Sequence, residues 1–196
     1  MEVRFGERLC TATTLLLPIM LVSVGCFGSL DTERPSPGKV LFFYIEKPRK
    51  LAYTYEVRSS EEIGAPFPDD PQKNVPLQYA NPAHACTAIR PARGNVVLIE
   101  RGECSFAEKA LTASKAGARF AIITDSEAGT DDWIDMISDG SAQKSNIPVA
   151  YLPGVSGRRI REYLMYGDER ITITIPLNYS TVLLNNIPRK PPWELW

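Results

Sequence analysis

Histidine and cysteine are both scarce in this sequence. His84 is the only histidine among 196 residues, and only four cysteines are present. Metal-dependent hydrolysis needs several histidine or carboxylate ligands around an open coordination position, so a histidine-rich metal centre is excluded. The sequence also contains no His-Glu-x-x-His segment and no phosphate-binding loop. We expect no metal site and no cofactor, with His84 as an ordinary loop residue.

Charge of one sign is not in excess either. The chain has 22 Lys and Arg residues against 23 Asp and Glu residues, which gives a formal net charge of −1. Binding to nucleic acid through its phosphates needs a basic surface, and this balance does not supply one. We therefore expect no nucleic acid partner.

Long apolar runs are absent apart from one near the start. This run covers residues 9–27, and Arg4 and Arg8 precede it. Basic residues, an apolar run and then small residues are typical of a secretory signal peptide, which we place at residues 1–28. The alternative is an uncleaved anchor, because the run approaches the ~20 residues that span a bilayer. Pro18 and several threonines within the run favour cleavage.

The remainder of the chain has the character of an exported protein. No other stretch is long and apolar enough to cross a membrane, so we expect a soluble chain without membrane contact after cleavage. We expect secretion through the endoplasmic reticulum and Golgi. Asn178, in the segment Asn-Tyr-Ser, is an N-glycosylation acceptor that fits this route. The sequence carries no signal of an oligomeric state.

Two cysteines remain once the leader is removed, Cys86 and Cys104. In an oxidising compartment they most simply pair with each other. Such a disulfide stabilises a fold by about 3 kcal/mol in the chain-entropy model. The alternatives are a free reactive thiol at Cys104, and a zinc site, which would need further ligands.

The region 29–74 holds two expected strands and a loop. Residues 40–45 and 51–57 are rich in aromatic and β-branched side chains, which favours a pair of strands joined by a turn. Residues 60–76 carry four prolines and an acidic pair. These breakers predict a long loop, and an irregular segment is expected over 77–91.

The region 75–176 contains a strand, a helix and a second strand in close succession. Residues 96–99 and 120–123 are continuously apolar, as in strands that are buried on both faces. Between them Ser105 and Glu108 form a capping box, which predicts the start of a helix. The order predicts a βαβ unit.

Three further elements complete the expected fold. Residues 147–152 are expected to form a strand, and Ser156 is expected to cap a helix that ends at Gly167. Residues 171–175 alternate strictly between isoleucine and threonine, which predicts a half-exposed strand. The proline-containing tail, residues 177–196, is expected to form neither a helix nor a central strand.

The segment VVLIERGECSF at 96–106 resembles the core of the protease-associated (PA) domain. The resemblance continues through Glu108-Lys109-Ala110, Ala116-Gly117-Ala118 and Ile147-Pro148-Val149. It implies a single α+β domain in which a β-rich sheet or barrel is flanked by short helices. It also implies a domain without catalytic residues. In sorting receptors of this family, the arginine that matches Arg101 lies near a peptide-binding surface.

Three residues are candidates for contact with a partner. Arg101 either forms internal bonds or touches a protein or peptide partner. Trp193 and Trp196 either pack on the chain's own surface or anchor another protein, since aromatic side chains are favoured at interfaces.

Gly102 is expected to permit a backbone turn that other residues resist.

Candidate enzymatic groups are weak. Ser156 lies in a segment that lacks the spacing of a nucleophile elbow. The acidic residues 131–139 lack the spacing and glycine of a calcium loop, and opening a short helix or facing solvent explains them equally well. We therefore expect no catalytic residues and a non-catalytic secreted glycoprotein that acts as a protein-interaction module. Alternatives are an accessory subunit of a protease or receptor in the secretory pathway and, more remotely, a cryptic hydrolase.

Overall fold

The computed structural model describes residues 38–193, apart from 128, 131, 141–142 and 180–185. The leader expected at residues 1–28, the sequon residue Ser180 and Trp196 lie outside the described residues.

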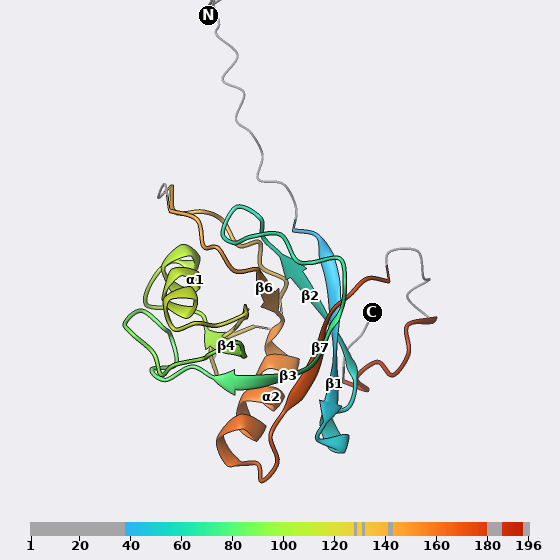
Figure 1. The fold of residues 1–196 in the computed structure, drawn as a ribbon. Coiled ribbons are helices and arrows are strands. Elements are labelled where there is room, and N and C mark those ends of the chain that lie inside the picture. The colour runs from blue at the N-terminus through green and yellow to red at the C-terminus, as the bar shows by residue number, and fades with distance from the viewer. Residues whose placement is uncertain (1–37, 128, 131, 141–142, 180–185, 194–196) are drawn as a thin grey trace, which may run out of the picture. The chain divides into compact units, whose positions relative to one another are not determined.

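Seven strands in the described residues close into a barrel, and two α-helices accompany it (Figure 1). The strands are β1 (Val40–Lys47), β2 (Thr54–Ser59), β3 (Gln72–Tyr79), β4 (Val96–Glu100), β5 (Phe120–Thr124), β6 (Val149–Leu152) and β7 (Thr172–Leu177). The helices are α1 (Phe106–Lys115), α2 (Gly154–Tyr166) and a short 3-10 helix, η1 (Arg49–Leu51). The α+β barrel with short helices agrees with the predicted fold class.

The barrel combines parallel and antiparallel strand pairs. Its strand order is β1-β2-β6-β5-β4-β3-β7. The pairs β3-β4, β4-β5 and β5-β6 are parallel, whereas the other four pairs, which involve β1, β2 and β7, are antiparallel and close the barrel. Strand β4, helix α1 and the parallel strand β5 confirm the predicted βαβ unit.

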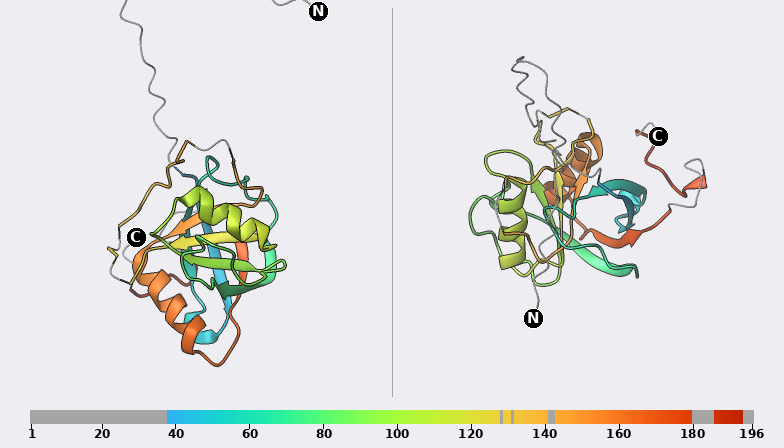
Figure 2. Two further views of the ribbon diagram at one scale, coloured as in Figure 1. Left: turned by 90° about the vertical axis from the view of Figure 1, so that its left-hand side faces the viewer. Right: turned by 90° about the horizontal axis from the view of Figure 1, so that it is seen from above.

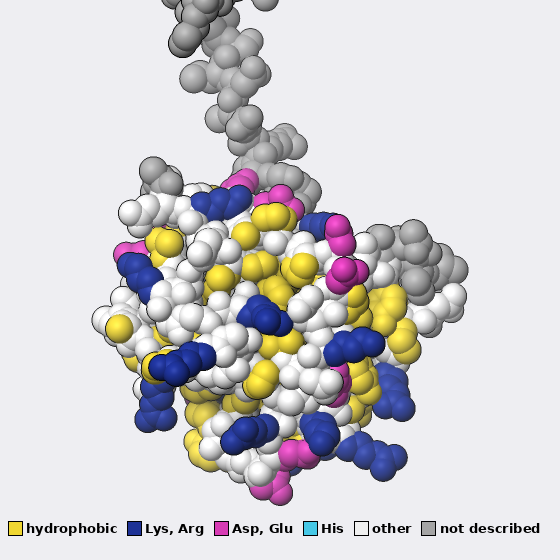
Figure 3. All heavy atoms as spheres, viewed as in Figure 1, with side chains coloured by type: hydrophobic (Ala, Val, Ile, Leu, Met, Phe, Trp, Pro, Cys, Tyr) yellow, Lys and Arg dark blue, Asp and Glu magenta, His cyan; other side chains and the backbone are white. Residues whose placement is uncertain are grey.

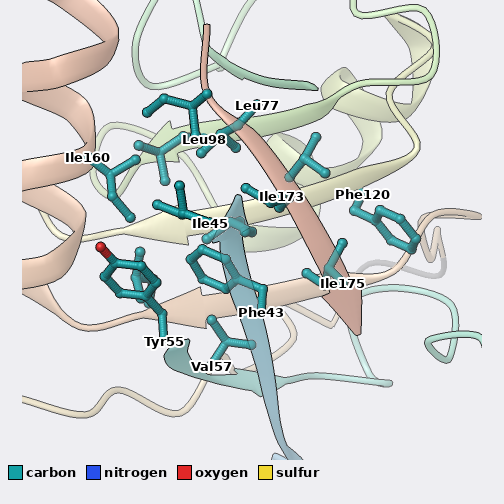
Figure 4. Packing of buried hydrophobic residues seen from close by; sticks show 14 of the residues in the cluster. Phe43, Ile45, Tyr55, Val57, Leu77, Leu98, Phe120, Ile160, Ile173 and Ile175 are labelled. Carbon is teal, nitrogen blue, oxygen red and sulfur yellow. The ribbon is translucent and has the colours of Figure 1, made fainter. Parts of the chain in front are cut away.

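Strands β4 and β5 are buried along their whole length because apolar groups cover both of their faces. Leu98 and Ile122 face the barrel interior, together with Ile160 of α2 (Figure 4). Val97 and Ala121 face outwards, into a second cluster formed with α1. Helix α1 lies across this outer face (Figure 2), and so the two strands have no face left for water.

Helix α1 begins where the capping box predicted. The Ser105 hydroxyl accepts a hydrogen bond from the Glu108 amide at 3.1 Å, and the Glu108 carboxylate accepts one from the Ser105 amide at 3.2 Å. Both orphan amides of the first turn are thereby satisfied.

Strand β3 was not predicted, and it corrects the expected loop over 60–76 and the irregular segment after it. Val75 and Leu77 alternate with exposed residues and enter the barrel core. The expected breaker Pro76 is tolerated within the strand, and its neighbour Leu77 donates to the Ile171 carbonyl at 2.9 Å. The prolines at 66, 68 and 71 obscured the alternation that follows them.

Two expectations near the end of the domain are also wrong. Ser156 does not cap α2, because the helix begins at Gly154 after Pro153, which leaves Ser156 inside the first turn. Strand β7 is mostly buried instead of half exposed, since it lies between β1 and β3 and closes the barrel. Thr174 lies on the opposite face of the strand from Ile173 and Ile175, where it is buried and its hydroxyl donates to the Glu46 carboxylate.

The described end of the chain packs against the barrel near β2. The Thr54 amide donates to the Arg189 carbonyl at 2.8 Å, and the Thr54 hydroxyl donates to the Pro188 carbonyl at 2.7 Å. Ile187 is buried. This segment contains no helix or strand, as the prolines predicted.

Candidate functional site

The candidate site is the corner that follows β4, residues Arg101–Cys104. Parallel strands end at the same edge of a sheet, and ligands of α/β proteins commonly bind beyond these carboxyl ends. Arg101 follows β4 and Asp125 follows the neighbouring β5. The Arg101 amide continues the strand pairing by donating to the Thr124 carbonyl at 2.8 Å.

Arg101 both forms an internal ion pair and reaches solvent. Its Nη1 atom lies 3.7 Å from Oδ1 of Asp125, while 44% of the Arg101 side chain is exposed. The Asp125 side chain is only 5% exposed. Among the described residues, Oδ2 of Asp125 has no hydrogen-bond partner. Arg101 therefore forms an internal ion pair, which is one of the two roles expected from the sequence, and part of its side chain remains open to solvent.

Gly102 turns the backbone away from the sheet. Its φ angle is +110°, in the region that residues with a Cβ rarely adopt, which agrees with the predicted turn. Glu103 follows with φ at +66°, and 65% of its side chain is exposed.

The disulfide Cys86–Cys104 ties this corner to the segment 84–86. The pairing predicted from export is thus present, and Cys104 is not a free thiol. The Cys104 amide also donates to the Gly102 carbonyl at 2.8 Å. The corner is closed by both a covalent and a main-chain link.

Lys109 joins the corner at Gly102 to the neighbouring segment at His84. Its fully buried Nζ donates to the carbonyls of His84 and Gly102, both at 2.6 Å, and lies 3.7 Å from Sγ of Cys86. Burial lowers the pKa of Lys109 from 10.5 to about 8. The ammonium still predominates at neutral pH, where two carbonyl oxygens replace its lost hydration.

His84 lies between the corner and two carboxylates. Its Nδ1 atom is 3.1 Å from the Arg101 carbonyl oxygen, and Nε2 is 3.4 Å from Glu103 and 4.0 Å from Glu100. Within the described ranges, His, Cys, Asp and Glu side chains form no group of three or more suited to a metal ion. The geometry gives His84 a role in shaping the corner.

Glu100, the last residue of β4, is the centre of a buried polar network behind the corner. Its Oε1 atom accepts hydrogen bonds from the Tyr79 hydroxyl and from Nη1 of Arg161, the latter at 2.9 Å. Burial and then the bond to Glu100 raise the pKa of Tyr79 far above its ordinary value. Nη2 of Arg161 reaches the exposed Glu127 at 3.5 Å, so the network links β3, β4 and α2.

The other sequence candidates lie away from this corner. Asn178 is exposed directly after β7. Trp193 packs on the domain itself, since its Nε1 donates to the Ser156 hydroxyl at 3.0 Å and its ring contacts Tyr53 edge-on. The described acidic residues of 131–139 form no helix, and Asp139 accepts a bond from the Ser105 hydroxyl at 2.6 Å.

Asp125 and Arg161 were not singled out from the sequence, and Lys109 was named only within the segment that resembles the PA domain. Lys109 lies four positions before the buried Ala113, so a charge on the apolar side of a predicted helix could have indicated a bonded, buried ammonium. Asp125 follows an apolar strand, and this position could have indicated its proximity to Arg101. Arg161 carried no comparable signal, because helix α2 was placed only approximately.

Charges of both signs are interspersed on the face shown in Figure 3. The pattern matches the near-neutral composition. None of the helices in the described residues is both long enough and apolar enough to span a bilayer.

Comparison with known proteins agrees with this architecture. A model of the PA domain family matches residues 73–160. A "PRADC1-like protein" of Drosophila melanogaster is 40% identical over 163 residues, which cover 80% of this chain and 82% of the fly protein. The chain therefore belongs to the protease-associated (PA) domain family. Within that family it is similar to protease-associated domain-containing protein 1, as the fly relative's name indicates.

More distant relatives share only part of their length with this chain. The bovine E3 ubiquitin-protein ligase RNF13 is 30% identical over 152 residues, which cover 67% of this chain and 39% of the ligase. The structure of an aminopeptidase from Aneurinibacillus sp. strain AM-1 superimposes with a TM-score of 0.51 and 22% identity, covering 72% of this chain and 31% of the enzyme. This structural likeness shows a shared fold alone.

Proposed function

We propose that this chain is a secreted glycoprotein whose PA domain binds a protein or peptide partner without catalysing a reaction. The corner Arg101–Cys104 is the proposed contact surface. One observation carries the proposal: an arginine whose side chain is 44% exposed extends from a backbone turn that a disulfide and a buried lysine hold in place, and an aspartate pairs with its guanidinium. A preorganised charged group loses little conformational freedom on binding, which favours recognition.

The bonding of the candidate reactive groups supports binding over catalysis. The Ser156 hydroxyl accepts a hydrogen bond from Trp193 inside helix α2 and is not presented as a nucleophile. Glu100 is engaged by Tyr79 and Arg161. His84 contacts the main chain and carboxylates of its own corner.

Export is tested by mass spectrometry of the full chain expressed in eukaryotic cells. We expect protein in the medium with a new N-terminus between about residues 26 and 31, an occupied Asn178 and a closed Cys86–Cys104 disulfide. Retention of the intact leader in the membrane fraction would contradict secretion and would place the PA domain on an anchored protein.

The contact surface is tested with a charge reversal. Proteins bound to the secreted wild-type chain are captured by crosslinking and identified, and the capture is repeated with Arg101→Glu. The matched control is Arg119→Glu, because Arg119 is an exposed arginine at the amino end of β5, opposite to the edge that holds Arg101. We expect Arg101→Glu to lose a partner that Arg119→Glu retains. Equal capture by all three proteins would place the partner elsewhere.

A second candidate function is that of an accessory subunit of a protease or receptor in the secretory pathway. It is favoured by a relative named "Signal peptide peptidase-like 4" of Oryza sativa, which is 26% identical over 84% of this chain, although the chain covers only 32% of that protein. Co-purification with a membrane protease or receptor, lost on Arg101→Glu, would favour this role over that of an independent secreted factor.

A further inference from the structure

The two sulfurs of the disulfide have different surroundings. Sγ of Cys86 lies 3.7 Å from the ammonium of Lys109, which is fully buried. Among the described residues, Sγ of Cys104 has no comparable contact with a cation, and its polar neighbour is the His84 carbonyl oxygen at 4.0 Å. The carbonyl oxygens of His84 and Gly102 also lie 3.6 Å and 3.9 Å from Sγ of Cys86, but both accept hydrogen bonds from the Lys109 ammonium, which offsets their negative partial charge. A thiolate is stabilised by a nearby positive charge, so opening of this disulfide favours a thiolate on Cys86.

Helix α1 offers a competing effect at Cys104, but the capping box weakens it. Cys104 precedes the helix, whose N-terminus would stabilise a nearby thiolate. Glu108 already occupies that end with its carboxylate, and the exposed Glu103 adds a second negative charge beside Cys104. The full charge of Lys109 in a buried position therefore outweighs the partial charge of the helix end.

We propose that the Cys86–Cys104 disulfide is a directional thiol-exchange site, at which a small thiol such as glutathione attacks Cys104 and expels Cys86. The attacking thiolate forms a new sulfur–sulfur bond to Sγ of Cys104. The Cys86–Cys104 bond breaks, and its electron pair remains on Cys86 as a thiolate beside Lys109. The proton of the attacking thiol is released to solvent, and the interchange involves no net oxidation or reduction. A more stable leaving thiolate departs faster, which sets the direction.

The product carries a small-molecule adduct on the corner that presents Arg101. Lys109 still joins the carbonyls of His84 and Gly102 after the disulfide opens, so the two segments remain together. Cys104 directly follows Gly102 and Glu103, so an adduct on it lies within the proposed contact surface. The exchange itself does not depend on the proposed partner, so its failure and that of the proposed function are distinguishable.

The position of the adduct is the direct test. The folded, secreted chain is incubated briefly with reduced glutathione, and an excess of iodoacetamide is then added, which stops the exchange and alkylates the thiolate that has been released. Peptide mapping then locates each modification. We expect glutathione on Cys104 and the alkyl group on Cys86, in about tenfold excess over the reverse arrangement. An equal mixture, or an excess of glutathione on Cys86, would overturn the proposal.

A substitution that removes the ammonium tests whether Lys109 causes the preference for glutathione on Cys104. Lys109→Met replaces the ammonium with an apolar side chain, and Lys115→Met is the control on the same helix because Lys115 is exposed. We expect Lys109→Met to lose the positional preference and to open about tenfold more slowly, while Lys115→Met behaves as the wild type. A preference retained in Lys109→Met would show that Lys109 is not its source. If that variant does not fold, the adduct map of the wild type decides the proposal.

Discussion

At the scale of single residues, the corner depends on charges that the fold has removed from water. Lys109 and Glu100 are both buried; Lys109 donates hydrogen bonds to carbonyls on two segments, and Glu100 accepts them from Tyr79 and Arg161. Burying a charge is costly unless it is paired or hydrogen-bonded, so these residues join segments instead of simply adding stability. Each predicts a distinct response to substitution.

The lowered pKa of Lys109 predicts a pH-dependent contribution to stability. Between pH 8 and 10.5 the folded chain has released this proton while the unfolded chain still holds it. The free energy of unfolding therefore rises with pH in this window because of Lys109. When the pH is raised from 8 to 10, the free energy of unfolding of the wild type, measured with urea, should increase relative to that of Lys109→Met. The contribution of Tyr79 is the same in both proteins and cancels in the difference. Lys115→Met keeps Lys109 and should therefore respond to pH as the wild type does.

Loss of Arg161 should be strongly destabilising. Arg161→Met leaves the Glu100 carboxylate buried, with the Tyr79 hydroxyl bonded to it and Nε2 of His84 at 4.0 Å. Breaking a buried ion pair by removing one partner costs about 3–5 kcal/mol. Urea unfolding of Arg161→Met should show a loss in this range, and adding Glu100→Gln should recover part of it. If Arg161→Met loses less free energy of unfolding than a substitution of an exposed arginine, such as Arg119→Met, the buried ion pair between Arg161 and Glu100 is contradicted.

At the scale of elements, helix α2 approaches β5 through a glycine. A Cβ atom built on Gly157 would lie 1.6 Å from Oγ1 of Thr124 and 2.7 Å from its Cβ. No rotation of Thr124 removes the second contact, so the helix would have to move away from the strand. The close approach brings Arg161 of the same helix within reach of Glu100 on β4.

Gly157→Ala should therefore destabilise the domain although alanine favours helices. The propensity gain is about 1 kcal/mol, whereas overpacking typically costs about 1–3 kcal/mol. We expect a net loss in thermal and urea unfolding, and Thr124→Ala in the same chain should reverse part of it because it removes the nearer atom. Two additive losses, with no coupling between the positions, would show that α2 and β5 do not meet there.

The sequence predicts elements best where local signals agree. The βαβ unit follows from two apolar runs and a capping box, and the corner between them was correctly expected to contain a turn at Gly102 and a paired Cys104. Strand β3 was missed because its pairing with β7 is a non-local contact that overrides a nearby proline. The pairing of Arg101 with Asp125 could have been inferred, because the predicted βαβ unit places the ends of β4 and β5 side by side. The bond of Lys109 to the His84 carbonyl could not, because the segment that holds His84 was expected only to be irregular.

At the scale of the whole described domain, Trp193 joins segments that are far apart in the sequence. Its ring lies edge-on to Tyr53, its Nε1 donates to Ser156 of α2, and the guanidinium of Arg159 lies 4.3 Å from the ring centroid. These contacts connect the end of the chain to α2 and to the residue that precedes β2. Aromatic and cation–π contacts of this kind contribute about 0.5–1.5 kcal/mol each.

Substitution of Trp193 distinguishes a structural role from that of a partner anchor. Trp193→Ala should lower the free energy of unfolding by about 2–4 kcal/mol, because it removes the ring packing and the bond to Ser156. Trp193→Phe keeps an aromatic ring but not the donor, so it should lose only about 1 kcal/mol. Both variants should still bind any partner that depends on Arg101, because Trp193 contacts helix α2 and not the corner after β4. A variant with unchanged stability but lost binding would instead make Trp193 the anchor, and would move the contact surface to the end of the chain.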